Sequence, residues 1–168
     1  GRVISKLADL KPNMIEKLVY VSASSFNSHE NNVNKSVSKE EVNAFIKNRY
    51  PTISSGQLSD FKYPENYPLW DDKYEELLKF KGFARALIST VKNHKNLDLE
   101  NKEISDSNKK VYTIWGDSDS VVIFNNIKGK LNKLLPNRFE YTVPNSGHLP
   151  HIENQSDFEK YLFEVVLK

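Results

Sequence analysis

Apolar residues occur along the chain in two patterns, short continuous runs and longer stretches with helical spacing. Continuous runs at residues 17–22, 111–115 and 139–143 predict three buried strands, because they are short and rich in β-branched or aromatic side chains. Between the second and third runs, the spacing predicts a helix that ends at Pro136 and has an apolar stripe of Phe124, Ile127, Leu131 and Leu134. Strand, helix and strand in succession are typical of a parallel sheet, so we predict an α/β fold whose strands pair in chain order.

Spacing and capping signals predict three further helices. The first begins at residue 1 and ends before Pro12, with an apolar face of Val3, Ile4, Leu7 and Leu10. A capping box at residues 38–41 opens the second, which Pro51 ends and whose inward face is Val42, Phe45 and Ile46. A capping box at residues 156–159 opens the last, with a buried stripe of Phe158, Leu162, Val165 and Val166.

Residues 24–108 break the alternation of strands and helices. An Asn- and Ser-rich stretch at residues 26–36 predicts a connection, and apolar positions from Trp70 to Val91 predict one long helix or a pair divided at Gly82. We therefore predict a discontinuous domain of residues 1–23 and 109–168, interrupted by a mostly helical insertion of residues 24–108.

The composition excludes several classes of function. The net charge is only +2, which offers no electrostatic case for a nucleic-acid or anionic membrane partner. The absence of cysteine excludes a disulfide, a thiolate metal site and a cysteine nucleophile. No apolar stretch approaches the roughly 20 residues of a membrane-spanning helix. The four histidines show no metal-ligand spacing.

Two residues that follow consecutive predicted strands carry complementary chemistry. Asp119 comes just after the run at 111–115, and His148 just after the run at 139–143. Because parallel strands end at one edge of the sheet, we expect a carboxylate oxygen of Asp119 within about 3.2 Å of a ring nitrogen of His148. Such a contact leaves the other ring nitrogen free as a base. The alternative is that Asp119 is a turn former and His148 a loop histidine, and either short motif alone favours this alternative.

Considered together, residues 115–119 (WGDSD) and 147–153 (GHLPHIE) resemble the closing third of an α/β-hydrolase. In that family a Gly-x-x-Asp after the next-to-last strand supplies the triad acid, and a Gly-His after the last strand supplies the base. The resemblance therefore implies that Asp119 is the acid and that His148, 29 positions later, is the base. It also implies that His151 and Glu153 support the loop of His148.

The resemblance also implies the arrangement of the whole chain. Three parallel strands with flanking helices would form the carboxyl-terminal part of the fold, and residues 24–108 would form its helical cap. Residues 1–23 resemble the helix after the nucleophile elbow and the strand that follows, with Gly1 either a trailing glycine of the elbow or a foreign residue. We therefore expect the nucleophile and the oxyanion-hole amides to precede residue 1, in a missing amino-terminal half of the same protein.

The activity implied for the complete protein is that of a serine-type hydrolase that acts on a small, apolar, ester-like substrate and needs no cofactor. Aromatic residues of the cap would either line the substrate pocket or pack the cap onto the core; they are Phe61, Tyr63, Tyr67 and Trp70. Two alternatives stay open: an epoxide hydrolase or dehalogenase with an aspartate nucleophile, and a non-catalytic receptor or scaffold on the same fold.

Overall fold

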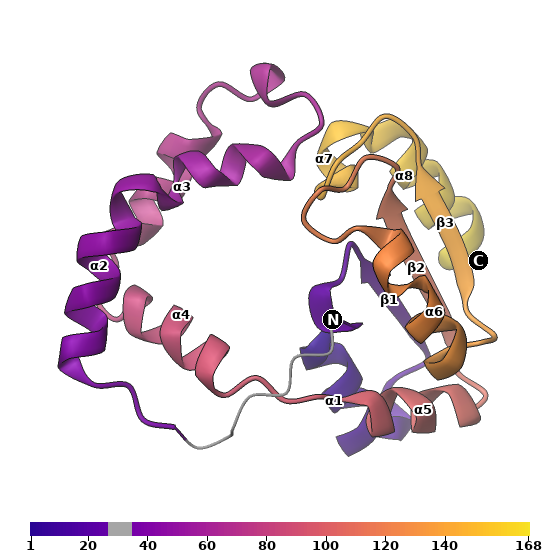
Figure 1. Cartoon of the computed structure of the whole chain (residues 1–168). Coiled ribbons are helices and arrows are strands. Elements are labelled where there is room, and N and C mark those ends of the chain that lie inside the picture. Colours follow the sequence, from indigo (N-terminus) through magenta and orange to yellow (C-terminus); the bar gives the residue numbers. More distant parts are fainter. Residues whose placement is uncertain (27–34) are drawn as a thin grey trace. The chain divides into compact units, whose positions relative to one another are not determined.

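The computed structural model describes residues 1–26 and 35–168, which divide into two compact units (Figure 1). Unit 1 contains the described residues of Gly1–Ser28, Asp60–Tyr63 and Leu97–Lys168, and unit 2 contains those of His29–Ser59 and Pro64–Asn96. Most of the connection predicted at residues 26–36 lies outside the described residues.

Unit 1 is built on a three-stranded parallel sheet, as the apolar runs predict. Its strands β1 (Lys17–Val21), β2 (Lys110–Gly116) and β3 (Phe139–Val143) lie in the order β1-β2-β3. Ile114 of β2 pairs with Val21 of β1 and with Tyr141 of β3. In the described part of the chain only β2 is paired on both sides, and β2 is accordingly buried from Val111 to Gly116. The predicted fold class and strand order are confirmed.

The helices of unit 1 are α1 (Arg2–Leu10), α5 (Asp98–Asp106), α6 (Phe124–Leu134), α7 (Pro150–Glu153) and α8 (Gln155–Tyr161). A π-helical turn, η5 (Leu162–Val166), continues α8, and two short 3₁₀ turns are η1 (Pro12–Met14) and η2 (Ser24–Phe26). Helix α6 connects β2 to β3 and buries Ile127 and Leu131 of its predicted stripe.

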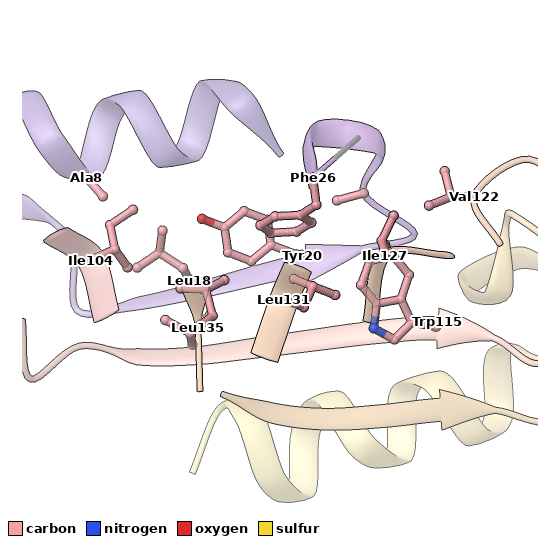
Figure 2. Close-up of a cluster of buried hydrophobic side chains, with 12 residues drawn as sticks. Ala8, Leu18, Tyr20, Phe26, Ile104, Trp115, Val122, Ile127, Leu131 and Leu135 are labelled. Atoms are coloured by element: carbon pink, nitrogen blue, oxygen red, sulfur yellow. The ribbon is translucent and has the colours of Figure 1, made fainter. Parts of the chain in front are cut away.

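The main hydrophobic core of unit 1 lies between one face of the sheet and helices α1, α5 and α6 (Figure 2). Strand β2 contributes Val111 and Trp115, alternate residues that share a face. The opposite face carries Tyr141, whose ring stacks on Tyr161 of α8 with a centroid separation of 4.2 Å. Helices therefore cover both faces of the sheet, and the loops after β2 and β3 leave from its carboxyl edge.

Helix α1 buries a different face from the predicted one. Ser5 and Ala8 are 0% and 3% exposed, whereas Val3 and Leu10 of the predicted face are 80% and 63% exposed. Of the predicted face, Ile4 packs against the core, whereas Val3, Leu7 and Leu10 are exposed. The prediction was therefore wrong for most of this face, because Ser5 finds polar partners that the local pattern does not reveal.

Those partners form a buried polar cluster that joins α1 to α5. The hydroxyl oxygens of Ser5 and Tyr20 are 2.9 Å apart, and Ser5 Oγ donates to Asn101 Oδ1 at 2.9 Å. Asn101 and Ile104 of α5 are both buried, and α5 belongs to unit 1. Residues 98–106 were predicted to lie in the insertion, because a helix with Ile104 as its one buried apolar residue shows no apolar stripe.

Unit 2 is helical in its described part and contains α2 (Lys39–Ile53), α3 (Trp70–Leu78) and α4 (Phe83–Lys92). It also contains two 3₁₀ turns, η3 (Ser55–Asp60) and η4 (Pro64–Asn66), although Asp60, the last residue of η3, belongs to unit 1. The capping box predicted for α2 is present: Ser38 Oγ accepts from Glu41 N at 3.2 Å, and Glu41 Oε2 accepts from Ser38 N at 2.8 Å. Gly82, with φ of 90°, precedes α4 and divides it from α3 as predicted.

Three details of the predicted helices were wrong. Pro51 lies inside α2, in its last turn, where the missing N–H removes only one helical hydrogen bond. No residue of α2 is buried, and Ile46 of the predicted inward face is 40% exposed. Helix α8 begins at Gln155, because the side chain of Asn154 caps it by accepting from Asp157 N. The role of unit 2 as a cap stays a prediction.

Within the residues that the structure describes, no helix combines the length and the apolar character needed to span a membrane.

The assignment of α5 to the core of unit 1 predicts unequal effects of two alanine substitutions. Ile104→Ala should lower the free energy of unfolding by about 2–5 kcal/mol, since it removes buried atoms and leaves a cavity. Leu99→Ala, at a position on the same helix that is 77% exposed, should change it by less than about 0.5 kcal/mol. Urea unfolding followed by circular dichroism measures both, and equal effects would contradict the assignment.

Candidate active site

The loops that follow β2 and β3 lie against each other at the carboxyl edge of the sheet. Asp117 N donates to Val143 O at 3.1 Å, and Ser118 N donates to Ser146 O at 2.9 Å. These backbone hydrogen bonds continue the pairing of β2 with β3 beyond the ends of the strands. The segments that carry Asp119 and His148 are therefore joined through their backbones.

Two glycines allow this close approach. A Cβ atom on Gly116 would lie 1.9 Å from Gly147 O and 2.6 Å from Ser146 O, distances that real Cβ atoms do not show. A Cβ atom on Gly147 would lie 2.6 Å from Asp60 O. The glycines of the Gly-x-x-Asp and Gly-His motifs are thus explained by backbone contact, since neither has a positive φ.

The carboxylate of Asp117 provides a further connection between the loops. It accepts hydrogen bonds from Asn145 N at 2.9 Å, Ser146 N at 3.3 Å and Ser118 Oγ at 2.7 Å. Burial alone would raise the pKa of Asp117, but these hydrogen bonds and the nearby Lys62 lower it below its ordinary value. No role for Asp117 was predicted from the sequence.

Asp119 is buried and has a donor for each carboxylate oxygen. Oδ1 accepts from Val121 N at 2.9 Å and Val122 N at 2.8 Å, and Oδ2 lies 3.0 Å from His148 Nδ1. Burial opposes ionisation, but the hydrogen bonds from His148 and the two amides outweigh it and lower the pKa of Asp119. The predicted proximity of Asp119 and His148 is confirmed.

The environment of His148 defines its protonation and its orientation. The hydrogen bond to Asp119 raises the pKa of the imidazole, burial opposes this rise, and the charges of Asp119 and Asp60 add to it. An ionised carboxylate only accepts hydrogen bonds, so neutral His148 carries its proton on Nδ1. Within the described residues no hydrogen-bond partner occupies Nε2, and the side chain is 21% exposed. Nε2 is therefore free to accept a proton.

Glu153, which is predicted to support this loop, accepts a hydrogen bond from Gly147 N at Oε2. His151 lies with its ring centroid 5.8 Å from that of Phe158, and within the described residues it forms no hydrogen bond or ion pair with Asp119. Burial and the neighbouring His148 lower the pKa of His151. Of the two histidines in this loop, only His148 has a carboxylate partner.

The four aromatic residues predicted to line a pocket divide between the two units. Phe61 and Tyr63 belong to unit 1, where Phe61 is 6% exposed and Tyr63 is 40% exposed. Tyr67 and Trp70 belong to unit 2, and both are partly buried. A pocket formed by these residues stays a prediction. In the described ranges, no group of three His, Cys, Asp or Glu side chains is arranged to hold a metal ion.

The contacts of residues 60–63 with the loop of His148 were not predicted from the sequence. Asp60 O accepts a hydrogen bond from His148 N at 2.6 Å, and Glu153 Oε1 accepts one from Lys62 N at 2.8 Å. These contacts join residues about 90 positions apart and use backbone groups, which leave no pattern in the sequence.

Comparisons with known proteins bear on the whole chain. A family model of the alpha/beta hydrolase fold matches residues 1–155. The chain is 26% identical over 182 residues to the uncharacterized hydrolase YugF of Bacillus subtilis (strain 168), a match that covers 99% of this chain and 62% of that protein.

Solved structures show the same fold at lower identity. The 2-hydroxy-6-oxo-6-phenylhexa-2,4-dienoate hydrolase (BphD) from Rhodococcus sp. strain RHA1 matches with a TM-score of 0.72 and 16% identity, over 99% of this chain and 60% of that one. A thermophilic esterase from Thermogutta terrifontis matches with a TM-score of 0.68 and 13% identity, over 98% of this chain and 60% of that one. The chain thus spans about 60% of the length of these proteins.

The close contact of the two loops predicts opposite effects of two Gly→Ala substitutions. Gly116→Ala should destabilise the protein and separate Asp119 from His148, so that the pKa of His148 falls toward its ordinary value. Gly129→Ala should stabilise it by about 0.5–1 kcal/mol, because Gly129 lies inside α6 with nothing within 4 Å of an added Cβ atom. Denaturant unfolding and NMR titration of His148 test the pair. Wild-type stability and titration in Gly116→Ala would refute the contact.

Proposed function

The chain belongs to the alpha/beta hydrolase fold family, and we propose that it provides the acid and the base of a serine-type catalytic triad. Asp119 is the acid and His148 is the base. The nucleophile is a serine outside residues 1–168, on a segment that precedes α1 in the complete protein. The observation that carries the proposal is the 3.0 Å contact between the buried carboxylate of Asp119 and Nδ1 of His148.

The mechanism follows from the state of each group. Nε2 of His148 removes the proton of the serine hydroxyl as the serine oxygen attacks the substrate carbonyl, and Asp119 stabilises the resulting imidazolium. The imidazolium then gives its proton to the departing alcohol oxygen, leaving an acyl-enzyme. Water releases the acid in the second half of the reaction, with His148 again accepting a proton and returning it to serine.

Several observations support hydrolysis in preference to a binding role alone. The lowered pKa of Asp119 keeps it ionised near neutral pH, and the raised pKa of His148 makes it a stronger base than a free histidine. The similar proteins include an esterase and a dienoate hydrolase. We propose a small, apolar ester or related acyl compound as the substrate.

Substitutions of the two residues test these roles in a protein that joins residues 1–168 to the segment bearing the nucleophile. His148→Ala should lower kcat on short-chain aryl esters on the order of a thousandfold or more, and Asp119→Asn should also lower it severely by favouring the wrong tautomer. The matched control is Asp106→Asn. It should retain kcat within about tenfold, since Asp106 is exposed on α5.

Residues 1–168 expressed alone should give no ester turnover above background, because acid and base without nucleophile and oxyanion hole cannot form the acyl-enzyme. An aryl phosphonate should react covalently with a serine of the active protein, and mapping the labelled residue would identify the nucleophile. Full activity in His148→Ala, or turnover by residues 1–168 alone, would disprove the proposed mechanism.

The pKa of His148 predicts the pH dependence of the activity. Since His148 must be neutral to act as a base, kcat/KM should rise with pH through an apparent pKa above the ordinary histidine value of about 6.5. Removing the charge of Asp119 takes away the main cause of the raised pKa, so the residual activity of Asp119→Asn should rise at lower pH than that of the wild type. Asp106→Asn should leave the profile in place. An acid limb that does not move in Asp119→Asn would contradict the assignment.

A further inference from the structure

Residues Asp60–Tyr63, here called the strap, lie against the loop of His148. The amide of His148 donates to Asp60 O at 2.6 Å, and Gly147 approaches the strap so closely that an added Cβ atom would lie 2.8 Å from Lys62 N. The ammonium group of Lys62 lies 3.3 Å from Asn145 Oδ1. The strap therefore contacts the backbone of the proposed base and the loop that leads to it.

Glu153 connects the strap to this loop with both carboxylate oxygens. Oε1 accepts from Lys62 N at 2.8 Å and from Tyr63 N at 3.3 Å, and Oε2 accepts from Gly147 N. Three backbone donors from two segments thus share one side chain. Glu153 itself is placed by the short helix α7, which begins at Pro150, two positions after His148.

We propose that Glu153 is a positioning residue that binds the strap to the loop of His148 and thereby holds the imidazole against Asp119. The proposal rests on the proposed function, since it concerns the base of the same site. Glu153 makes no hydrogen bond to Asp119 or to the ring of His148, so it acts through Gly147 and the strap.

The chemistry of the three donors explains why this position requires a carboxylate. Each oxygen of Glu153 faces backbone N–H groups, and a carboxylate accepts at both oxygens. A glutamine in the same place has one accepting oxygen and one NH₂ group, so either Gly147 or the strap would face a donor. An unsatisfied, partly buried N–H is costly, and the segment with the lost contact should open more often.

The strap also brings a second carboxylate to the imidazole. The titratable groups that influence His148 are Asp119 and Asp60, which raise its pKa, while His148 in turn lowers the pKa of His151. Release of the strap would weaken the influence of Asp60 and loosen the contact with Asp119, so the titration of His148 reports the position of the strap. In sequence, the strap is preceded and followed by residues of unit 2.

The test compares Glu153→Gln with Glu164→Gln, which removes the same charge from an exposed residue of η5. Amide hydrogen exchange and NMR titration are measured on the whole chain, without substrate. In Glu153→Gln, exchange at Gly147 or at Lys62 and Tyr63 should be faster by about tenfold or more, and the pKa of His148 should fall. The amides of β2 should keep their wild-type exchange, and Glu164→Gln should match the wild type throughout.

Glu153→Asp provides a second measure in case Glu153→Gln does not fold. Its carboxylate is one methylene shorter and cannot reach both segments, so one of the two sets of amides should again lose protection. Wild-type exchange and wild-type titration of His148 in either folded variant would overturn the proposal. Because neither readout needs catalysis, this result is independent of whether His148→Ala abolishes ester hydrolysis.

Discussion

Backbone contact between the loops after β2 and β3 is the constraint on which the site depends. Parallel pairing of Gly116 with Val143 brings the two loops to one edge of the sheet, and hydrogen bonds from Asp117 and Ser118 extend that pairing. The contact is possible because Gly116 has no side chain. It places Asp119 and His148 together, although the two residues are 29 positions apart.

Hydrogen bonding then determines how the carboxylates beside this contact ionise. Burial raises the pKa of each of Asp60, Asp117 and Asp119, but only the last two accept hydrogen bonds that outweigh burial. The carboxylate of Asp60 accepts none from the described residues, so the pKa of Asp60 stays raised. Asp119 is thus held as the ionised partner of His148, while Asp60 adds a smaller electrostatic contribution to the same imidazole.

Features encoded in local patterns were predictable from the sequence, and features that depend on distant partners were not. The three strands and α6 were predicted because their apolar spacing is continuous, and the contact of Asp119 with His148 followed from where parallel strands end. The buried face of α1 was missed because Ser5 depends on Asn101, 96 positions away. The strap was missed because its contacts to Glu153 and His148 use backbone amides and carbonyls, which every residue type offers.

The central claim is that Asp119 holds His148 in the tautomer that leaves Nε2 free. The ¹⁵N chemical shifts of the His148 ring, recorded in labelled protein above the pKa of His148, test it most directly. Our account predicts one dominant tautomer, with the proton on Nδ1 and none on Nε2, and loss of that preference in Asp119→Asn. A ring protonated on Nε2, or shifts that average the two tautomers as in free histidine, would contradict it.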